Sequence, residues 1–424
     1  MITTMRNTFI TPEVLAEMSR NQSYIVKFLL YKEIDKSFNQ DNISINSLPH
    51  DVHDKIVEHY KRLLPSRYVL RDWVPKDKLD WFTLSGNSCA YEILMEQADY
   101  ENTLTEEEYN MLAKEKKISW MRLCCINGEA IDILKKYPSK IQWAYLSNNK
   151  KQQVVDMIKE RIEYEKINVP EYYEENRVCI NNFSDNENPQ IIEFIKKRIE
   201  YEKGLSKEEY KKIDIYDVLD WSYISANPNA IDILKDNVDK INWFELSSNT
   251  NPRAIELLRE RAIIEKNMSR IDYRRLRNKI DWFNLSINPN AIDLLKENED
   301  NIMWGYLSGN PNAIDLLEKN KDNIEWSILS INTNPRAIEM LNDNHKNIDW
   351  FMLSKNPNAI ELLKKNRENI NWRALCINEN AHELIKERVE YEMSLTPEEY
   401  KELKYGNKLD WNQLSKNKGI FVAV

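Results

Sequence analysis

The chain has 424 residues, a formal net charge of −9, seven glycines and five cysteines. This length is too great for one compact core, so several domains or a repeat array are expected. The acidic balance argues against a general nucleic-acid binder, although a local basic face remains compatible with it. Few glycines and no strand-like alternation favour an all-α chain. Cysteines without a pairing pattern fit a reducing compartment.

Residues 1–77 do not fit the repeat described below and are predicted to form a small helical N-terminal region. Tyr24, Phe28 and Tyr31 follow one another at helical spacing and predict an amphipathic helix. Pro49 is expected to open a further helix that leads towards the repeats. The first residues lack a signal sequence, and no apolar run approaches the roughly 18 residues that span a bilayer. We therefore expect a soluble, cytoplasmic protein without a membrane partner.

Residues 78–424 consist of short repeats, which predict an α-solenoid. One unit reads Asp-Trp-Phe-Asn-Leu-Ser-Ile-Asn-Pro-Asn-Ala-Ile-Asp-Leu-Leu-Lys-Glu-Asn from Asp281 to Asn298. We count about twelve units, the last of them incomplete. Their anchor positions are Trp81, Trp120, Trp143, Ile180 in a degenerate unit, Trp221, Trp243, Trp282, Trp304, Trp326, Trp350, Trp372 and Trp411.

Each unit is predicted to be a helix-turn-helix. Asp281 is expected to cap a first helix that carries Trp282, and Asn288-Pro289 to open a second. The unit at Met303 lacks the Asp cap, so its first helix should be weaker. Asn298 is expected to end the second helix in a left-handed conformation.

Stacked units would bury the tryptophans between successive layers. At about 8–10 Å per layer, twelve layers would form a rod or superhelix on the order of 100 Å long. Five units are longer than the rest, and Thr105, Ser206 and Thr396 begin capping boxes for a third helix in three of them. Unequal units should bend the solenoid and create a ridge or groove. The apolar tail at 419–424 is expected to cap the last layer or to dock a partner.

The sequence carries no catalytic motif, and we expect no enzyme, no cofactor and no small-molecule substrate. A metal site at His50 and His53 would need further ligands, and an exposed helix start is the preferred interpretation. Cys124 and Cys376 stand where other units have serine, so we expect them to be small core residues. The local basic cluster could meet RNA or an acidic partner, although a solvated helix face is the default interpretation. It consists of Arg270, Arg274, Arg275 and Arg277.

The first N-terminal motif is Tyr24-Ile25-Val26-Lys27-Phe28-Leu29-Leu30. It resembles the Tyr-x-x-x-x-Leu-Φ helix with which the scaffold subunit of the translation initiation complex grips the cap-binding protein. Tyr24, Leu29 and Leu30 match the three defining positions, and Phe28 matches a residue common in that scaffold. The resemblance implies a cap-binding initiation factor as partner, docked on a short amphipathic helix. The alternative is an ordinary amphipathic helix packed on the first repeats.

The second N-terminal motif runs from Leu48 to Ile56 and resembles the start of an F-box, the adaptor helix that docks on ubiquitin-ligase cores. Leu48, Pro49, Val52 and Ile56 fit that pattern. The resemblance implies ubiquitin-ligase subunits as partners. A capped helix leading into the solenoid is the simpler alternative.

The repeats themselves resemble helical-repeat proteins encoded by giant DNA viruses of amoebae. The resemblance covers Trp-x-x-Leu-Ser-x-Asn-Pro-x-Ala-Ile-x-Leu-Leu and the Asn/Lys/Ile-rich background. It implies a viral protein acting in the host cytoplasm or viral factory. The leading functional hypothesis is a non-enzymatic protein-protein interaction scaffold for translation initiation; the alternative is an F-box-like substrate adaptor. The partner's identity, the binding face, the curvature and the oligomeric state are not readable from the sequence.

Overall fold

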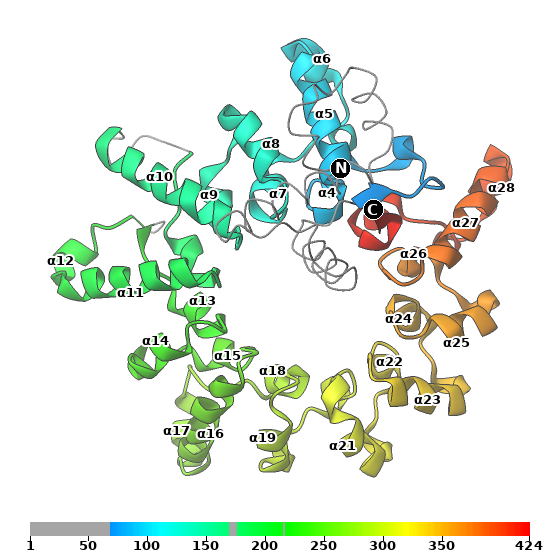
Figure 1. The fold of residues 1–424 in the computed structure, drawn as a ribbon. Helices are drawn as coiled ribbons and strands as arrows, with labels where there is room; N and C mark the ends of the chain where they lie inside the picture. The colour runs from blue at the N-terminus through cyan, green and yellow to red at the C-terminus, as the bar shows by residue number, and fades with distance from the viewer. Residues whose placement is uncertain (1–67, 169–175, 215–216) are drawn as a thin grey trace, which may run out of the picture. The chain divides into compact units, whose positions relative to one another are not determined.

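A computed structural model describes residues 68–168, 176–214 and 217–424. Within these ranges the chain is an all-α solenoid of short helical repeats, as predicted (Figure 1). Twelve units follow one another, and each begins with a first helix that starts at its anchor position or, in the fourth unit, one residue after it. The first helices are α4 (Trp81–Leu84), α7 (Trp120–Cys125), α9 (Trp143–Leu146), η7 (Asn181–Asp185), α13 (Trp221–Ala226), α15 (Trp243–Leu246), α18 (Trp282–Ile287), α20 (Trp304–Leu307), α22 (Trp326–Leu329), α24 (Trp350–Lys355), α26 (Trp372–Leu375) and α29 (Trp411–Lys416).

A second helix follows in the first eleven units. The second helices are α5 (Tyr91–Thr103), α8 (Ile131–Lys136), α10 (Gln152–Asn168), α11 (Pro189–Gly204), α14 (Ile231–Lys235), α16 (Pro252–Lys266), α19 (Ile292–Lys296), α21 (Ile314–Lys319), α23 (Pro335–Asp343), α25 (Ile360–Lys365) and α27 (His382–Ser394). Long units add α6 (Glu106–Met111), α12 (Lys207–Tyr210), α17 (Arg270–Arg275) and α28 (Pro397–Glu402).

Single turns of 3₁₀-helix connect many of these elements. They are η3 (Lys76–Lys78), η4 (Ser88–Ala90), η5 (Lys114–Lys116), η6 (Pro138–Lys140), η9 (Val238–Lys240), η10 (Glu299–Asn301), η11 (Pro311–Ala313), η12 (Lys321–Asn323), η13 (His345–Asn347), η14 (Arg367–Asn369), η15 (Tyr405–Asn407) and η16 (Lys418–Ile420). Two short strands, β1 (Tyr68–Leu70) and β2 (Phe421–Ala423), pair with each other.

Local capping explains where the short helices begin. Asp281 accepts a hydrogen bond from the Phe283 N–H, whereas Met303 provides no cap to α20, and both outcomes were predicted. The three predicted capping boxes are all formed, at α6, α12 and α28. The left-handed ending predicted at Asn298 is wrong, because its φ is −136°. Its side chain instead donates 2.9 Å to the Leu294 carbonyl oxygen, which satisfies one of the orphan acceptors at the helix end.

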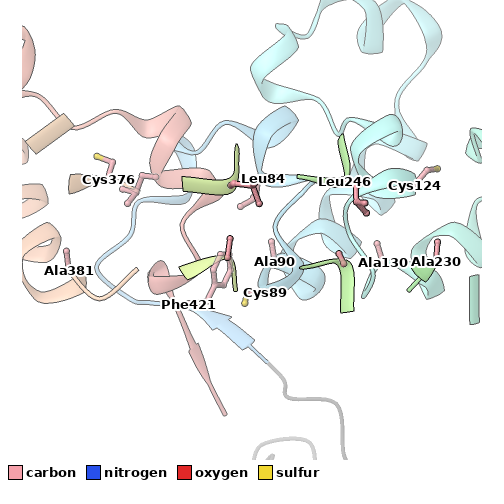
Figure 2. Close-up of a cluster of buried hydrophobic side chains, with 14 of the residues drawn as sticks. Leu84, Cys89, Ala90, Cys124, Ala130, Ala230, Leu246, Cys376, Ala381 and Phe421 are labelled. Atoms are coloured by element: carbon pink, nitrogen blue, oxygen red, sulfur yellow. The ribbon is translucent and has the colours of Figure 1, made fainter. Parts of the chain in front are cut away.

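The core is a continuous apolar cluster that runs through every unit. Figure 2 shows its two levels: Leu84 and Cys124 come from first helices and Cys376 directly follows one, whereas Ala130 and Ala381 precede second helices. Among the anchor tryptophans, Trp81 and Trp243 are buried. The other nine are half-buried and pack against the cluster, so the predicted stacking holds with one edge of most indoles exposed.

A buried asparagine joins each unit to the unit before it. Asn332 donates from Nδ2 to the carbonyl oxygens of Ser308 (2.8 Å) and Asn310 (3.1 Å), and its Oδ1 accepts from the Asn334 N–H (2.9 Å). The equivalent residues form an asparagine ladder in which every side chain is at most 3% exposed. Its members are Asn87, Asn127, Asn149, Asn186, Asn227, Asn249, Asn288, Asn310, Asn332, Asn356, Asn378 and Asn417.

A second ladder uses the residue four positions after each anchor. The Ser308 Oγ donates to the Trp304 carbonyl oxygen (2.9 Å) and accepts from the Glu325 N–H of the next unit (3.0 Å). Cys124 and Cys376 accept the equivalent N–H groups on sulfur, at 3.4 and 3.2 Å. Both cysteines are fully buried, which confirms their predicted role as small core residues.

Both ladders continue from the last unit to the first. The Asn87 Nδ2 donates to the carbonyl oxygens of Ser415 (3.1 Å) and Asn417 (3.3 Å), and the Asp80 N–H donates to Ser415 Oγ (2.9 Å). The other units contact their predecessors through the same ladder positions, so the twelve units form a closed array (Figure 1, red beside blue). The predicted rod or superhelix of about 100 Å is therefore wrong in that its two ends are bonded to each other.

The apolar tail helps to close the array. Ile420 and Phe421 are buried, β2 pairs with β1, and the Arg71 N–H donates 2.9 Å to the Ile420 carbonyl oxygen. Gly419 is needed where the tail passes the preceding unit, because a Cβ there would overlap the Glu379 carbonyl oxygen. Of the two predicted roles for the tail, the structure places residues 420 and 421 in the core, against the first unit.

Candidate protein-interaction surface

The predicted docking residues of the N-terminal region lie outside the described residues. This holds for Tyr24, Phe28, Leu29 and Leu30, for Leu48, Pro49, Val52 and Ile56, and for the histidines His50 and His53. Their assignments stay predictions. The candidate surface that the structure describes is on the repeat array.

The polar residues that recur in the units form hydrogen bonds that hold the repeats together. Each ladder asparagine uses its amide on the preceding unit and its oxygen on its own turn, and each ladder serine or cysteine holds the next unit's first helix. Burial raises the pKa of the Cys124 thiol to about 11 and that of Cys376 to about 12. Neither thiol is therefore a thiolate at neutral pH, as a nucleophile or metal ligand would require.

Long units contain an additional buried carboxylate with the same kind of structural role. Glu265 accepts from the Arg261 Nε (2.8 Å) and from the Ile280 N–H (3.1 Å), which fixes the chain where it turns into the following unit. The Arg261 guanidinium also lies 5.1 Å from the ring centre of Trp243. Glu392 and Arg388 repeat the arrangement with the Leu409 N–H.

Burial raises the pKa of two of these carboxylates. Burial raises the pKa of Glu392, although hydrogen bonds from the Leu409 N–H and from Arg388 act in the opposite direction. Burial likewise raises the pKa of Glu101. No three His, Cys, Asp or Glu side chains gather into a metal-binding group in the part of the chain that the structure describes.

The exposed residues of the first helix differ from unit to unit. The residue one or two positions after the anchor is an exposed aromatic in many units. In units five to eight these aromatics follow without interruption, and we call them the aromatic row: Tyr223 (53% exposed), Phe244 (51%), Phe283 (38%) and Tyr306 (46%). Phe283 and Tyr306 touch edge to face, with ring centres 4.0 Å apart, so units seven and eight are in contact along this side.

Aliphatic residues extend the aromatic row. Ile287 and Ile331, five positions after their anchors, are 46% and 39% exposed. A Cβ at Gly309 would lie 3.1 Å from Ile328 Cγ2, so α20 and α22 also approach closely here. An exposed apolar patch of the kind that Phe283 and Tyr306 form is typical of a protein-interaction site.

The predicted basic cluster lies elsewhere, on and just after α17. Arg270, Arg274, Arg275 and Arg277 are all exposed, and none forms an ion pair within the described ranges. This agrees with a solvated helix face, and the prediction of an RNA contact stays untested.

Comparison with protein-family models, with curated proteins and with solved structures gives no match. No helix in residues 68–168, 176–214 and 217–424 is long and apolar enough to cross a membrane. The fold itself defines a class, a closed α-solenoid of short Trp/Asn repeats.

Sequence reasoning missed the aromatic row, although a signal for it exists. Two helical turns cannot bury every side, so an aromatic directly after a core tryptophan has to point elsewhere. Phe244 follows Trp243, and Phe283 follows Trp282. Comparing these two positions across the units would have identified the row.

Proposed function

We propose that the protein is a non-enzymatic scaffold for protein-protein interactions. The observation that supports this best is that structural and exposed residues are separate within each unit. The polar residues that recur in every unit form hydrogen bonds to the neighbouring units, and the position that varies carries exposed aromatic side chains. The recurring polar groups therefore stabilise the fold, and the variable side chains are exposed for contact with a partner.

Closure of the array suits a scaffold. In an open solenoid the end units have only one neighbour and are the first to fray. Here the first and last units are joined by Asn87, Ser415 and Asn417 in the same way as all others. A surface built on such units keeps its side chains in fixed relative positions, which lowers the entropy lost on binding.

The more specific form of the proposal is a viral scaffold for translation initiation in the host cytoplasm. It depends on the resemblance of Tyr24, Phe28, Leu29 and Leu30 to the cap-binding-protein-binding helix. In this form the N-terminal region holds the cap-binding protein, and the array holds further factors. The alternative is an F-box-like adaptor that uses Leu48, Pro49, Val52 and Ile56 to hold a ubiquitin ligase while the array recruits its target.

Affinity purification of the tagged full chain from amoebal host cells, followed by mass spectrometry, tests both forms. One variant carries Tyr24→Ala and Leu29→Ala, and its matched control carries Leu48→Ala and Val52→Ala. Cap-binding and helicase factors that are lost only in the first variant support the translation scaffold. Ubiquitin-ligase subunits that are lost only in the second support the adaptor. If neither variant loses a partner that the wild-type chain captures, both N-terminal assignments are wrong.

A further inference from the structure

We propose that the aromatic row is a docking site for a basic, amphipathic polypeptide segment of a partner protein. This inference rests on the proposed scaffold function and names the chemistry of the partner that the array would hold. It concerns the first helices of units five to nine, which are α13, α15, α18, α20 and α22.

The aromatic row exposes a large apolar area. Tyr223, Phe244, Phe283 and Tyr306 stand on four successive units, each with between 38% and 53% of its surface exposed. Aromatic residues supply large contact areas with few rotatable bonds, and they dominate the energetics of protein interfaces. An apolar face on the partner, such as one side of an amphipathic helix, is the natural complement.

The first helices beneath the aromatic row supply carboxylates and no cation of their own. The five first-helix segments, from the cap residue to the ladder asparagine, contain no lysine and no arginine. They are residues 220–227, 242–249, 281–288, 303–310 and 325–332. The same segments contain four carboxylates, Asp220, Glu245, Asp281 and Glu325.

The next units along the chain, ten and eleven, differ in this respect. Unit ten contains Lys355, whose ammonium lies 3.9 Å from the ring centre of the exposed Phe351, and unit eleven contains Arg373. In units five to eight the row has aromatic faces without such a cation of its own. Lysine and arginine side chains of a partner can stack on these faces and pair with the carboxylates at the same time.

Two of the four carboxylates cap their own helices and are held in place by the fold. Asp281 Oδ1 accepts from the Phe283 N–H, and Asp220 Oδ1 accepts from the Ser222 N–H (2.8 Å). Fixed negative charges beside apolar rings favour a partner that alternates cationic and apolar side chains, and they repel acidic partners and nucleic acid.

Fluorescence anisotropy of labelled synthetic peptides with the full-length protein tests the proposal. The first probe is an amphipathic helix of lysine and leucine. The second replaces every lysine with glutamate, and the third replaces every leucine with serine. We expect binding of the first peptide alone, with an affinity that falls as ionic strength rises.

Two pairs of variants locate the binding. Tyr306→Ser should weaken the lysine-leucine peptide at least about tenfold, as loss of an interface hot spot does. Tyr100→Ser is its control, because Tyr100 is similarly exposed (50%) on α5, away from the row. Glu245→Gln with Glu325→Gln should weaken binding, whereas Glu106→Gln with Glu107→Gln removes the same charge from α6 and should not.

Three results would overturn the proposal. These are equal binding of the glutamate-leucine peptide, row variants that bind like the wild-type protein, or self-association in sedimentation velocity that Tyr306→Ser abolishes. The last would make the row an interface between two copies. None of these results bears on partner capture by the N-terminal region, so the scaffold function is judged separately by the affinity purification above.

Discussion

Truncation of one ladder asparagine tests how the array is held together. Asn310 is 1% exposed, and its amide donates to the carbonyl oxygens of Ser286 (3.0 Å) and Asn288 (3.1 Å). Its Oδ1 accepts from the Asn312 N–H at 3.0 Å. Asn310→Ala removes three buried hydrogen bonds at about 1 kcal/mol each and leaves their partners without replacement, so we expect a loss of about 3–5 kcal/mol in the free energy of unfolding.

The matched control is Asn312→Ala, two residues further along the same turn. Asn312 is exposed, and its amide makes one hydrogen bond across the layers, to the Pro289 carbonyl oxygen at 3.0 Å. We expect a loss below about 1 kcal/mol, as for other surface positions. Urea titration followed by tryptophan fluorescence and far-UV circular dichroism measures both values. Equal losses for the two variants would show that the ladder does not carry the inter-unit stability.

Three further predictions concern the core. Trp304→Ala should cost about 2–4 kcal/mol in a urea titration, since the indole is half-buried; a loss below about 0.5 kcal/mol would mean that it faces solvent. Cys376→Ser should change stability by less than about 1 kcal/mol, whereas Cys376→Val leaves the Asp410 N–H unpaired and should cost about 1–3 kcal/mol more. Because burial raises the folded-state pKa of Glu101, its contribution is greatest below the unfolded pKa of about 4.3 and is lost as pH rises through the folded pKa. The wild-type chain should therefore lose stability relative to Glu101→Gln as pH rises above about 4 in urea titrations, and a relative gain would contradict the assignment.

The repeat and its elements could be predicted because they depend on local chemistry. A few neighbouring residues are enough to identify each anchor tryptophan, Asp cap and capping box. The capping box at Thr105, for example, needs only Thr105 and Glu108. A fourth cap, at Ser269, was overlooked because its partner is Asp272 and not glutamate.

The ladder was harder to predict, because the Asn-Pro pair concealed it. In four units the ladder asparagine directly precedes proline, as in Asn288-Pro289. In three others the proline follows a later asparagine, as in Asn332-Thr333-Asn334-Pro335. Counting from the anchor, an asparagine stands at the sixth position in eleven of the twelve units. That regularity, and not the proline, identifies the residue that binds the preceding unit.

Closure could not be predicted from the repeats at all. Neighbour contacts are encoded in each unit, but the small rotation between units that decides whether the ends meet is a sum of many packing details. The tail gave a partial signal, since Gly419 to Val424 replaces the second helix with a short apolar segment. The side-chain bonds at the junction, such as that from Asn412 Nδ2 to Thr83 Oγ1 (2.8 Å), connect residues 329 positions apart.

The most direct test of the closed array is a distance measured across the junction. Spin labels at Ser88 and Lys418 occupy equivalent positions in the first and last units, and labels at Glu379 and Lys418 occupy them in two consecutive units. Both pairs are placed in a background with the half-buried Cys125 replaced by serine. Double electron-electron resonance should give similar distances for the two pairs, because the last unit is bonded to the first as it is to its predecessor. A much longer distance between Ser88 and Lys418 would mean that the array is open.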